Sequence, residues 1–157
     1  MLKMPIPDAA AIGRRAEIAA ALRRIVPGEG VIEAPVEMRA YETDGLTAYR
    51  QLPLVVVLPE TTVQVSAILR FCSASNVKIV PRGAGTGLSG GALPNPEGVL
   101  LSLARMKRIL AVDPVARIAR VQPGVRNLAV SEAAAPYGLY YAPDPSSQIA
   151  CTIGGNV

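Results

Sequence analysis

The 157-residue sequence contains no histidine. This absence excludes a Ser-His-Asp triad, a histidine metal ligand and a histidine general base from the chain. Tryptophan is also absent and aromatic residues make up only 4% of the chain, so we expect an aliphatic core. No apolar run approaches the roughly 20 residues that a membrane-spanning helix needs, and the N-terminus lacks the continuous apolar segment of a secretion signal. A cytoplasmic location without a membrane span is the default expectation.

Cysteine and charged residues are also scarce. Cys72 and Cys151 stand far apart and in no metal-spaced cluster, which favours free, buried thiols over a disulfide framework or a metal site. Charged residues make up 18% of the chain and give a net charge of +4, with the arginines spread along the sequence. This distribution does not favour nucleic-acid binding, and it is compatible with an anionic small ligand.

Half of the residues are apolar, which is enough for one moderate core. The pattern predicts an amphipathic helix over 9–26, a buried strand over 54–58, a helix from Thr61 or Thr62 to Asn76 and a strand over 77–80. This strand-helix-strand unit permits a parallel pairing of its two strands. The expected fold class is therefore α/β.

Shorter elements are expected in the second half of the chain. The pattern predicts a strand over 98–103, a strand pair over 109–112 and 116–121, a helix over 125–135 and a short strand over 138–141. The strand pair is joined by a turn at Asp113-Pro114. Prolines and glycines predict irregular backbone after residue 141.

A glycine-rich stretch at residues 81–94, PRGAGTGLSGGALP, follows the strand over 77–80 directly. Its spacing satisfies the dinucleotide fingerprint G-x-G-x-x-G, which is weak as a pattern alone. A Rossmann turn needs a helix that opens within the motif and an acidic residue about twenty positions later. The following prolines oppose that helix, and residues 104–110 are basic. A P-loop is disfavoured as well, because no Lys-Ser or Lys-Thr pair follows the glycines.

Backbone donors are the chemistry that this glycine-rich loop can offer. Glycines reach positive φ without steric penalty, so successive N–H groups can point into one concavity that binds phosphate. The hydroxyls of Thr86 and Ser89 can add donors, and Arg82 can add positive charge. The alternative interpretation is a mobile surface linker, and for Arg82 an ordinary surface arginine.

Several stretches together resemble a known family. The loop resembles the pyrophosphate loop of the FAD-binding domain shared by the vanillyl-alcohol oxidase and p-cresol methylhydroxylase flavoproteins. Matching motifs follow the family order at residues 41–50 (YETDGLTAYR), 121–136 (VQPGVRNLAVSEAAAP) and 140–157 (YYAPDPSSQIACTIGGNV). Within the family they are similar to the D subunit of bacterial glycolate oxidase, with D-lactate and D-2-hydroxyglutarate dehydrogenases further away. No chemical role is assigned to residues 41–50.

The resemblance implies two groups of cofactor-binding residues. Those assigned to the FAD pyrophosphate are Pro81, Arg82, Gly83, Ala84, Gly85, Thr86, Gly87, Ser89 and Gly90. Those assigned to a second part of the cradle, along the ribityl chain and isoalloxazine, are Pro143, Asp144, Ser146, Ser147, Thr152, Gly154, Gly155 and Asn156. Gly124 is a weaker candidate near the adenine. Without the resemblance, residues 143–147 are simply a turn.

The form of cofactor attachment follows from the missing histidine. Some relatives attach flavin covalently through a histidine within the glycine loop, and Thr86 stands at that position here. Because the chain has no histidine, that attachment is excluded and non-covalent FAD is expected.

The resemblance also implies the architecture and the activity. We expect a two-subdomain α/β (α+β) FAD-binding domain of the p-cresol methylhydroxylase type, truncated in its second subdomain, with a lead-in over residues 1–50 and the domain over 51–157. In the family, FAD accepts hydride from the α-carbon of a 2-hydroxy acid. The substrate-binding groups belong to a separate cap domain, so this chain alone is expected to be inactive and its catalytic residues are unknown.

The implied partners are a small 2-hydroxy acid, a second flavin-domain subunit and an iron–sulfur subunit. Such partners would associate the protein with the inner face of the membrane through electron transfer to quinone. Three alternatives stay open: a D-lactate or D-2-hydroxyglutarate dehydrogenase-like fragment, a non-catalytic module for FAD or another nucleotide, and a phosphate-binding domain unrelated to flavin.

Overall fold

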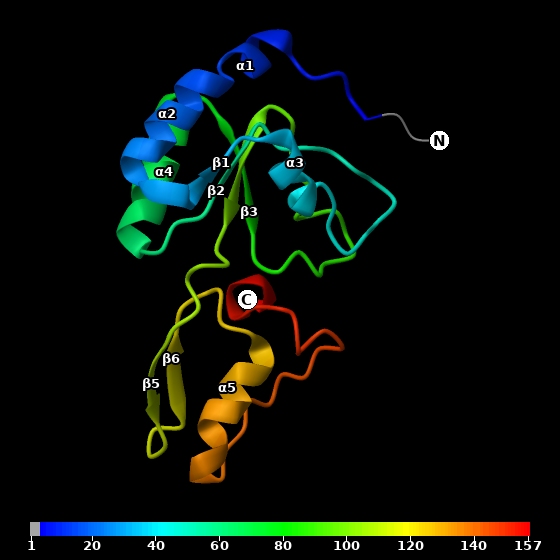
Figure 1. Ribbon diagram of the computed structural model, residues 1–157. Helices are drawn as coiled ribbons and strands as arrows, with labels where there is room; N and C mark the ends of the chain where they lie inside the picture. Colours follow the sequence, from blue (N-terminus) through cyan, green and yellow to red (C-terminus); the bar gives the residue numbers. More distant parts are fainter. Residues whose placement is uncertain (1–3) are drawn as a thin grey trace.

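The computed structural model describes residues 4–157, which form two packed units (Figure 1). The strands are β1 (Val31–Ile32), β2 (Val55–Val57), β3 (Lys78–Arg82), β4 (Gly98–Ser102), β5 (Ile109–Asp113) and β6 (Ile118–Val121). The helices are α1 (Ala9–Gly13), α2 (Arg15–Ile25), α3 (Pro35–Met38), α4 (Thr62–Ala74), α5 (Asn127–Ala134) and α6 (Ile153–Asn156). Short 3-10 turns occupy Gly28–Gly30, Arg39–Tyr41 and Ala135–Tyr137. The first unit contains β1 to β4, and the second contains β5, β6 and α5.

The first unit is built on a four-stranded sheet in the order β1-β2-β4-β3. β2 and β3 both pair with β4 in parallel, and β1 pairs with β2 antiparallel. The three predicted strands and their parallel direction are confirmed. The direct pairing of β2 with β3 that the strand-helix-strand unit permits does not form, because β4 lies between them. Every residue of β4 is buried, as expected for the apolar run GVLLS in the middle of a sheet. β3 lies at the edge of the sheet and is partly exposed.

Both faces of this sheet are buried, so the first unit has two apolar clusters. On one face, Val55, Val57, Val99 and Leu101 pack with residues of α2 and α4. On the other face, Val56 and Leu100 pack with Met38 of α3. Helices α2 and α4 lie together beside the sheet, with α3 on the opposite side (Figure 1). Residues from the first 50 positions therefore contribute to both clusters.

The helix predictions hold for α4 and α5, with one correction near the N-terminus. Thr61 caps α4 in a capping box, in which its Oγ1 accepts from the Gln64 N–H at 3.2 Å. Asn76, with φ of 52°, lies just beyond the end of α4 in the left-handed region that ends helices. The single helix expected over 9–26 is wrong: it breaks at Arg14, where ψ is 1°. The preceding Gly13 is a poor helix former, and the chain kinks there.

The second unit consists of the β5-β6 hairpin, which is the predicted strand pair, and of α5, which is the predicted helix. Asp113 Oδ1 accepts from the N–H groups of Val115 and Ala116, which fixes the hairpin turn. The strand expected over 138–141 is wrong: Gly138 forms a left-handed turn with φ of 69°, residues 139–141 have no strand partner, and the Tyr141 N–H donates to Ser131 Oγ. Irregular backbone after residue 141 is confirmed up to residue 150, but α6 forms beyond it. Among residues 4–157, no helix combines the length and apolarity that crossing a membrane requires.

Candidate functional site

A cavity of about 270 Å³ opens where the glycine-rich loop leaves the carboxyl end of β3. In parallel sheets this is the edge at which ligands commonly bind. The loop forms one wall and the chain around α6 forms the other. The lining residues are Pro81, Gly83, Ala84, Gly85, Thr86, Gly87, Ser89, Gly91, Ala92, Cys151, Thr152, Gly155 and Asn156. We call this space the loop cavity; it unites most of the predicted pyrophosphate residues with the last residues of the predicted cradle.

A second cavity, of about 530 Å³, lies between the two units and is called the junction cavity. Its lining residues are Gly83, Ala84, Ala104, Lys107, Ile109, Gly124, Val125, Arg126, Ala129 and Thr152. Three of these residues, Gly83, Ala84 and Thr152, also line the loop cavity. The two spaces therefore meet at these residues, and the side chains of Lys107 and Arg126 bring positive charge to the junction cavity.

The loop keeps its backbone donors free. Among the hydrogen bonds between residues 4 and 157, none uses a backbone N–H of residues 83–92 as its donor. Gly85 and Gly90 have φ of 73° and 77°, which side-chain-bearing residues rarely adopt. The loop contains no helix over residues 83–97, so the structure agrees with the rejection of a Rossmann turn. Free donors on a glycine backbone are what phosphate oxygens require.

Thr152 stands at the point where the two cavities meet. It is 7% exposed, and its Oγ1 has no hydrogen-bond partner among the described residues. A side chain added at Gly83 would collide with that same Oγ1, so the loop and residue 152 approach each other closely. Arg126 pairs with Thr152 in an isolated antiparallel bridge, which ties this wall to the second unit. A buried hydroxyl without a partner is available to a bound ligand.

Gly90 and Arg82 are the predicted loop residues that do not line the loop cavity, and Arg82 has other contacts. Its half-buried guanidinium donates from Nη1 to the carbonyls of Tyr41, Thr43 and Ala92, at 3.2, 2.7 and 3.4 Å. The guanidinium also lies 5.8 Å from the centroid of the Tyr41 ring. Burial lowers the pKa of Arg82, and the charges of Asp44 and Tyr41 oppose that shift. A phosphate contact by Arg82 stays a prediction.

The rest of the predicted cradle is separated into two parts. Pro143, Asp144, Ser146 and Ser147 line neither cavity; they form a turn held by internal hydrogen bonds and by Asn127 Nδ2 donating to Pro143 O at 3.2 Å. Gly154 packs against Pro123, where an added Cβ would lie 3.1 Å from the Pro123 carbonyl oxygen. The structure thus brings Thr152, Gly155 and Asn156 to the loop but not residues 143–147.

Two features of the site escaped the sequence patterns. Gly91, Ala92 and Cys151 also line the loop cavity. Residues 41–45 lie against the outside of the loop, where a Cβ on Gly45 would be 2.6 Å from the Thr86 carbonyl oxygen. The family-like stretch at 41–50 was a signal for the second feature, but nothing in its sequence names the loop as its partner.

The comparisons with known proteins identify the family. The model of a family described as FAD binding domain matches residues 53–157. The chain belongs to this family of FAD-binding domains. FAD is accordingly the cofactor of the domain, and the glycine loop lies inside the matched region.

The names of the sequence relatives are those of an oxidase subunit and of dehydrogenases. The chain is 62% identical to glycolate oxidase subunit GlcD of Escherichia coli (strain K12) over 91% of its length, which is 29% of that protein. It is 35% identical to a D-2-hydroxyglutarate dehydrogenase of Xanthomonas citri pv. viticola over 87% of its length and 29% of that protein. The chain therefore spans under a third of the length of these relatives, and the resemblance to both groups is confirmed.

Solved structures confirm the fold. The 4-ethylphenol oxidase of Gulosibacter chungangensis superposes with a TM-score of 0.79 at 24% identity, covering 97% of this chain and 30% of that one. p-Cresol methylhydroxylase superposes with a TM-score of 0.70 at 21% identity, covering 81% and 25%. The expected α/β fold of the p-cresol methylhydroxylase type is thus correct.

Proposed function

We propose that this chain is the FAD-binding part of a glycolate oxidase D-subunit-like enzyme that oxidises a 2-hydroxy acid. The observation that carries the proposal is the loop cavity: glycine-loop residues with free backbone donors line one wall, and Thr152, whose hydroxyl has no partner, lines the other. Donors without partners around a glycine backbone suit a diphosphate, whose oxygens accept hydrogen bonds and whose size requires close backbone approach. The 62% identity to the E. coli subunit supports the enzyme class.

The pyrophosphate of FAD would lie where the two cavities meet. The amides of the loop would donate to its oxygens, Thr86 and Ser89 would add hydroxyl donors, and Thr152 would donate from the opposite wall. Lys107 and Arg126 would supply positive charge from the junction cavity. Bound FAD supplies the acceptor for hydride from the substrate α-carbon. Residues 143–147 and Gly154 would then act as supports of the cradle rather than as its lining.

The finer parts of the proposal concern attachment, partners and location. Non-covalent FAD is supported by the absence of histidine. A multisubunit assembly is supported by the name of the E. coli relative, which is a subunit of glycolate oxidase. We extend this to a second flavin-domain subunit and an iron–sulfur subunit, and to a cytoplasmic complex at the inner membrane face. Glycolate is the first substrate candidate, and D-2-hydroxyglutarate is the second because of the Xanthomonas relative.

The test is an FAD titration of the full chain as it is encoded, followed by anaerobic addition of glycolate, D-lactate or D-2-hydroxyglutarate. We expect the chain to bind FAD. In the complete enzyme, one of these acids should reduce the bound FAD and bleach its visible absorbance. Thr152→Val should weaken FAD binding about tenfold or more, because a hydrogen bond to a charged group contributes ~1.5–3 kcal/mol. The fluorescence of free flavin measures the bound fraction.

The matched control is Thr62→Val, because Thr62 is an exposed residue on α4. It should leave the FAD affinity unchanged within about twofold, since surface substitutions change free energies by less than ~0.5 kcal/mol. FAD binding without bleaching by any of the acids would favour the non-catalytic module. No binding of FAD at all would sink the proposed function.

A further inference from the structure

The guanidinium of Arg82 lies against Gly85 of the glycine loop and does not line the loop cavity. It reaches back over about forty positions of sequence to the carbonyls of Tyr41 and Thr43, and it also reaches the Ala92 carbonyl at the far end of the loop. One side chain therefore joins the start of the loop, its end and the lead-in segment. The three acceptors are uncharged carbonyls. The half-buried guanidinium therefore donates hydrogen bonds to them without having its positive charge neutralised.

Two glycines show that the loop is shaped around this guanidinium. A side chain at Gly85 would collide with the guanidinium of Arg82, and Gly85 holds φ of 73° at that point. On the other side of the loop, Gly45 approaches so closely that a Cβ would lie 2.6 Å from the Thr86 oxygen and 2.8 Å from the Gly87 oxygen. The bend at residues 85–87 is therefore enclosed by Arg82 and by residue 45.

The lead-in segment is itself ordered where it meets the loop. Asp44 is 4% exposed, and its Oδ1 accepts from the Leu46 N–H at 2.9 Å, which closes a tight turn around Gly45. The Asp44 charge acts on Arg82, and Tyr41 places its ring over the guanidinium. Segment 41–46 and the loop thus form one packed layer, with Arg82 at its centre.

We infer that Arg82 is a positioning residue: its guanidinium holds residues 41–46 against the glycine loop and thereby sets the loop conformation that binds FAD. The inference rests on the proposed function for its ligand and on the contacts above for its mechanism. A loop that is held in its bound conformation loses less conformational freedom on binding, and this raises affinity without a contact to the ligand.

The experiment compares Arg82→Gln with Arg82→Lys in the full chain. Lysine keeps the charge but lacks the planar guanidinium, whose Nη2, Cζ and Nε lie against Gly85 while Nη1 reaches the three carbonyls. We expect both variants to weaken FAD binding about tenfold or more, and to agree with each other within about threefold. Retention of wild-type affinity by Arg82→Lys alone would show that charge, and not position, matters, and would overturn the inference.

Hydrogen exchange without FAD gives a second readout that does not depend on the proposed function. The Gln51 N–H donates to Glu42 O and the Leu93 N–H donates to Gly90 O, so these amides report on the lead-in and on the loop. Arg82→Gln should speed exchange at both amides by about tenfold, because the segments open locally. Unchanged exchange would overturn the inference even if FAD binds, and faster exchange would support it even if the wild type binds no FAD.

Arg105→Gln is the matched control. Arg105 also ties distant segments, since it pairs with Glu60 and donates to Glu29 O, but it lines neither cavity. This variant should leave both readouts within about twofold of wild type. If Arg82→Gln fails to fold, Gly45→Ala replaces it, because it separates the same layers while leaving Arg82 in place. FAD binding by Gly45→Ala at wild-type strength would contradict the inference.

Discussion

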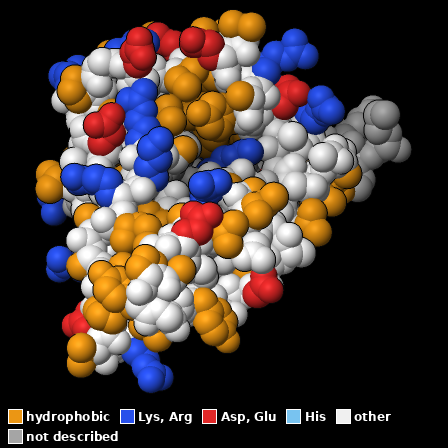
Figure 2. All heavy atoms as spheres, turned by 60° about the horizontal axis from the view of Figure 1, so that its bottom comes forward, with side chains coloured by type: hydrophobic (Ala, Val, Ile, Leu, Met, Phe, Trp, Pro, Cys, Tyr) orange, Lys and Arg blue, Asp and Glu red, His pale blue; other side chains and the backbone are white. Residues whose placement is uncertain are grey.

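The two units of this chain bury their strands to different extents. β2 and β4 of the first unit are buried at every residue, with helices on both sides of the sheet. β5 is exposed at all but one of its residues, and β6 alternates between exposed and half-buried positions. Figure 2, which brings the second unit forward, shows apolar side chains spread over its surface. A two-stranded ribbon with one helix gains little burial, so local stability should be unequal along the chain.

The candidate site is built from both units, which differ in burial. Its glycine loop extends from the buried sheet of the first unit, whereas Thr152 is tied to the second unit by the bridge to Arg126 and by the Ile153 N–H donating to Val125 O. A ligand that contacts both walls therefore links a well-buried unit to a weakly buried one. Since a ligand that binds only the folded state stabilises it, FAD should order the second unit more than the first.

Truncating one apolar side chain in each unit tests the difference in packing between the two units most directly. Leu100→Ala in β4 should lower the free energy of unfolding by about 2–5 kcal/mol, because Leu100 is 0% exposed and a cavity would remain. Ile118→Ala in β6 should lower it by less than about 0.5 kcal/mol, since Ile118 is 62% exposed. Urea denaturation followed by circular dichroism measures both. Equal losses would show that the second unit is as tightly packed as the first.

A smaller effect is expected at the connection between the units. Gly124 lies there, and a Cβ on it would be 2.7 Å from the Met106 carbonyl oxygen and would collide with that of Leu103. Gly124→Ala should therefore cost about 1–3 kcal/mol of stability through overpacking against backbone. Gly13→Ala is the control, because no atom lies within 4 Å of its added Cβ. It should be neutral or stabilising in the same urea titration.

The sequence predicted the elements that have strong local patterns. Short apolar runs predicted β2, β3 and β4, and the capping threonines Thr61 and Thr62 predicted the start of α4. Short elements such as β1 and α3 have too few residues for a periodicity. The strand order could not be predicted from local patterns. The position of β4 between β2 and β3 depends on which strand buries both of its faces, and this depends on the whole sheet.

For the site as well, the sequence predicted the local features and missed the contacts between distant segments. Glycine spacing marked the loop, and the family resemblance marked Thr152, Gly155 and Asn156, which the structure brings to it. The packing of residues 41–45 on the loop joins positions about forty residues apart, and no spacing rule connects them. The sequence also does not indicate where the side chain of Arg82 points. Its contacts with backbone carbonyls could therefore be found only in the structure.

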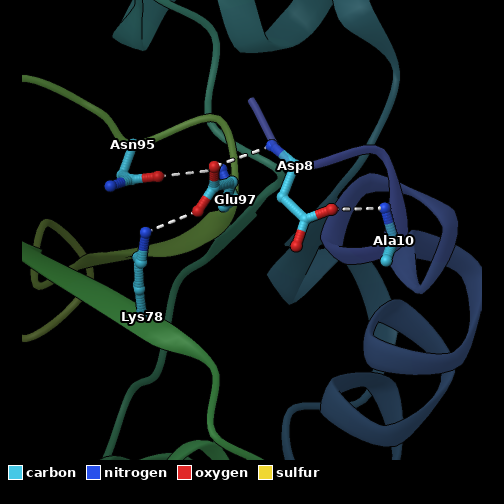
Figure 3. A network of polar contacts seen from close by, with 5 residues as sticks. All are labelled: Asp8, Ala10, Lys78, Asn95 and Glu97. Atoms are coloured by element: carbon cyan, nitrogen blue, oxygen red, sulfur yellow. Dashed lines mark hydrogen bonds and ion pairs between the residues drawn. The ribbon is translucent and has the colours of Figure 1, made fainter. Parts of the chain in front are cut away.

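The smallest expected effect concerns a surface connection of the first unit. Glu97 joins the N-terminal arm to the sheet edge: its Oε1 accepts from the Asp8 N–H at 2.8 Å and its Oε2 pairs with Lys78 (Figure 3). The hydrogen bond from Lys78, followed by that from Asp8, lowers the pKa of Glu97 below its ordinary value of 4.5. A carboxylate with a lowered folded pKa stabilises the fold above its unfolded pKa and loses that contribution as the pH falls through its folded pKa.

Glu97→Gln should therefore lower the melting temperature by about 1–3 °C at pH 7 and low salt, because exposed ion pairs contribute little. The difference from wild type should shrink as the pH falls below 4.5 and vanish once Glu97 is protonated in the folded protein. Differential scanning calorimetry between pH 7 and about pH 3 measures both curves. Glu132→Gln, at an exposed carboxylate of α5, should show neither change. A difference that did not shrink at all between pH 4.5 and about pH 3 would mean that the arm is held by packing rather than by the charge of Glu97.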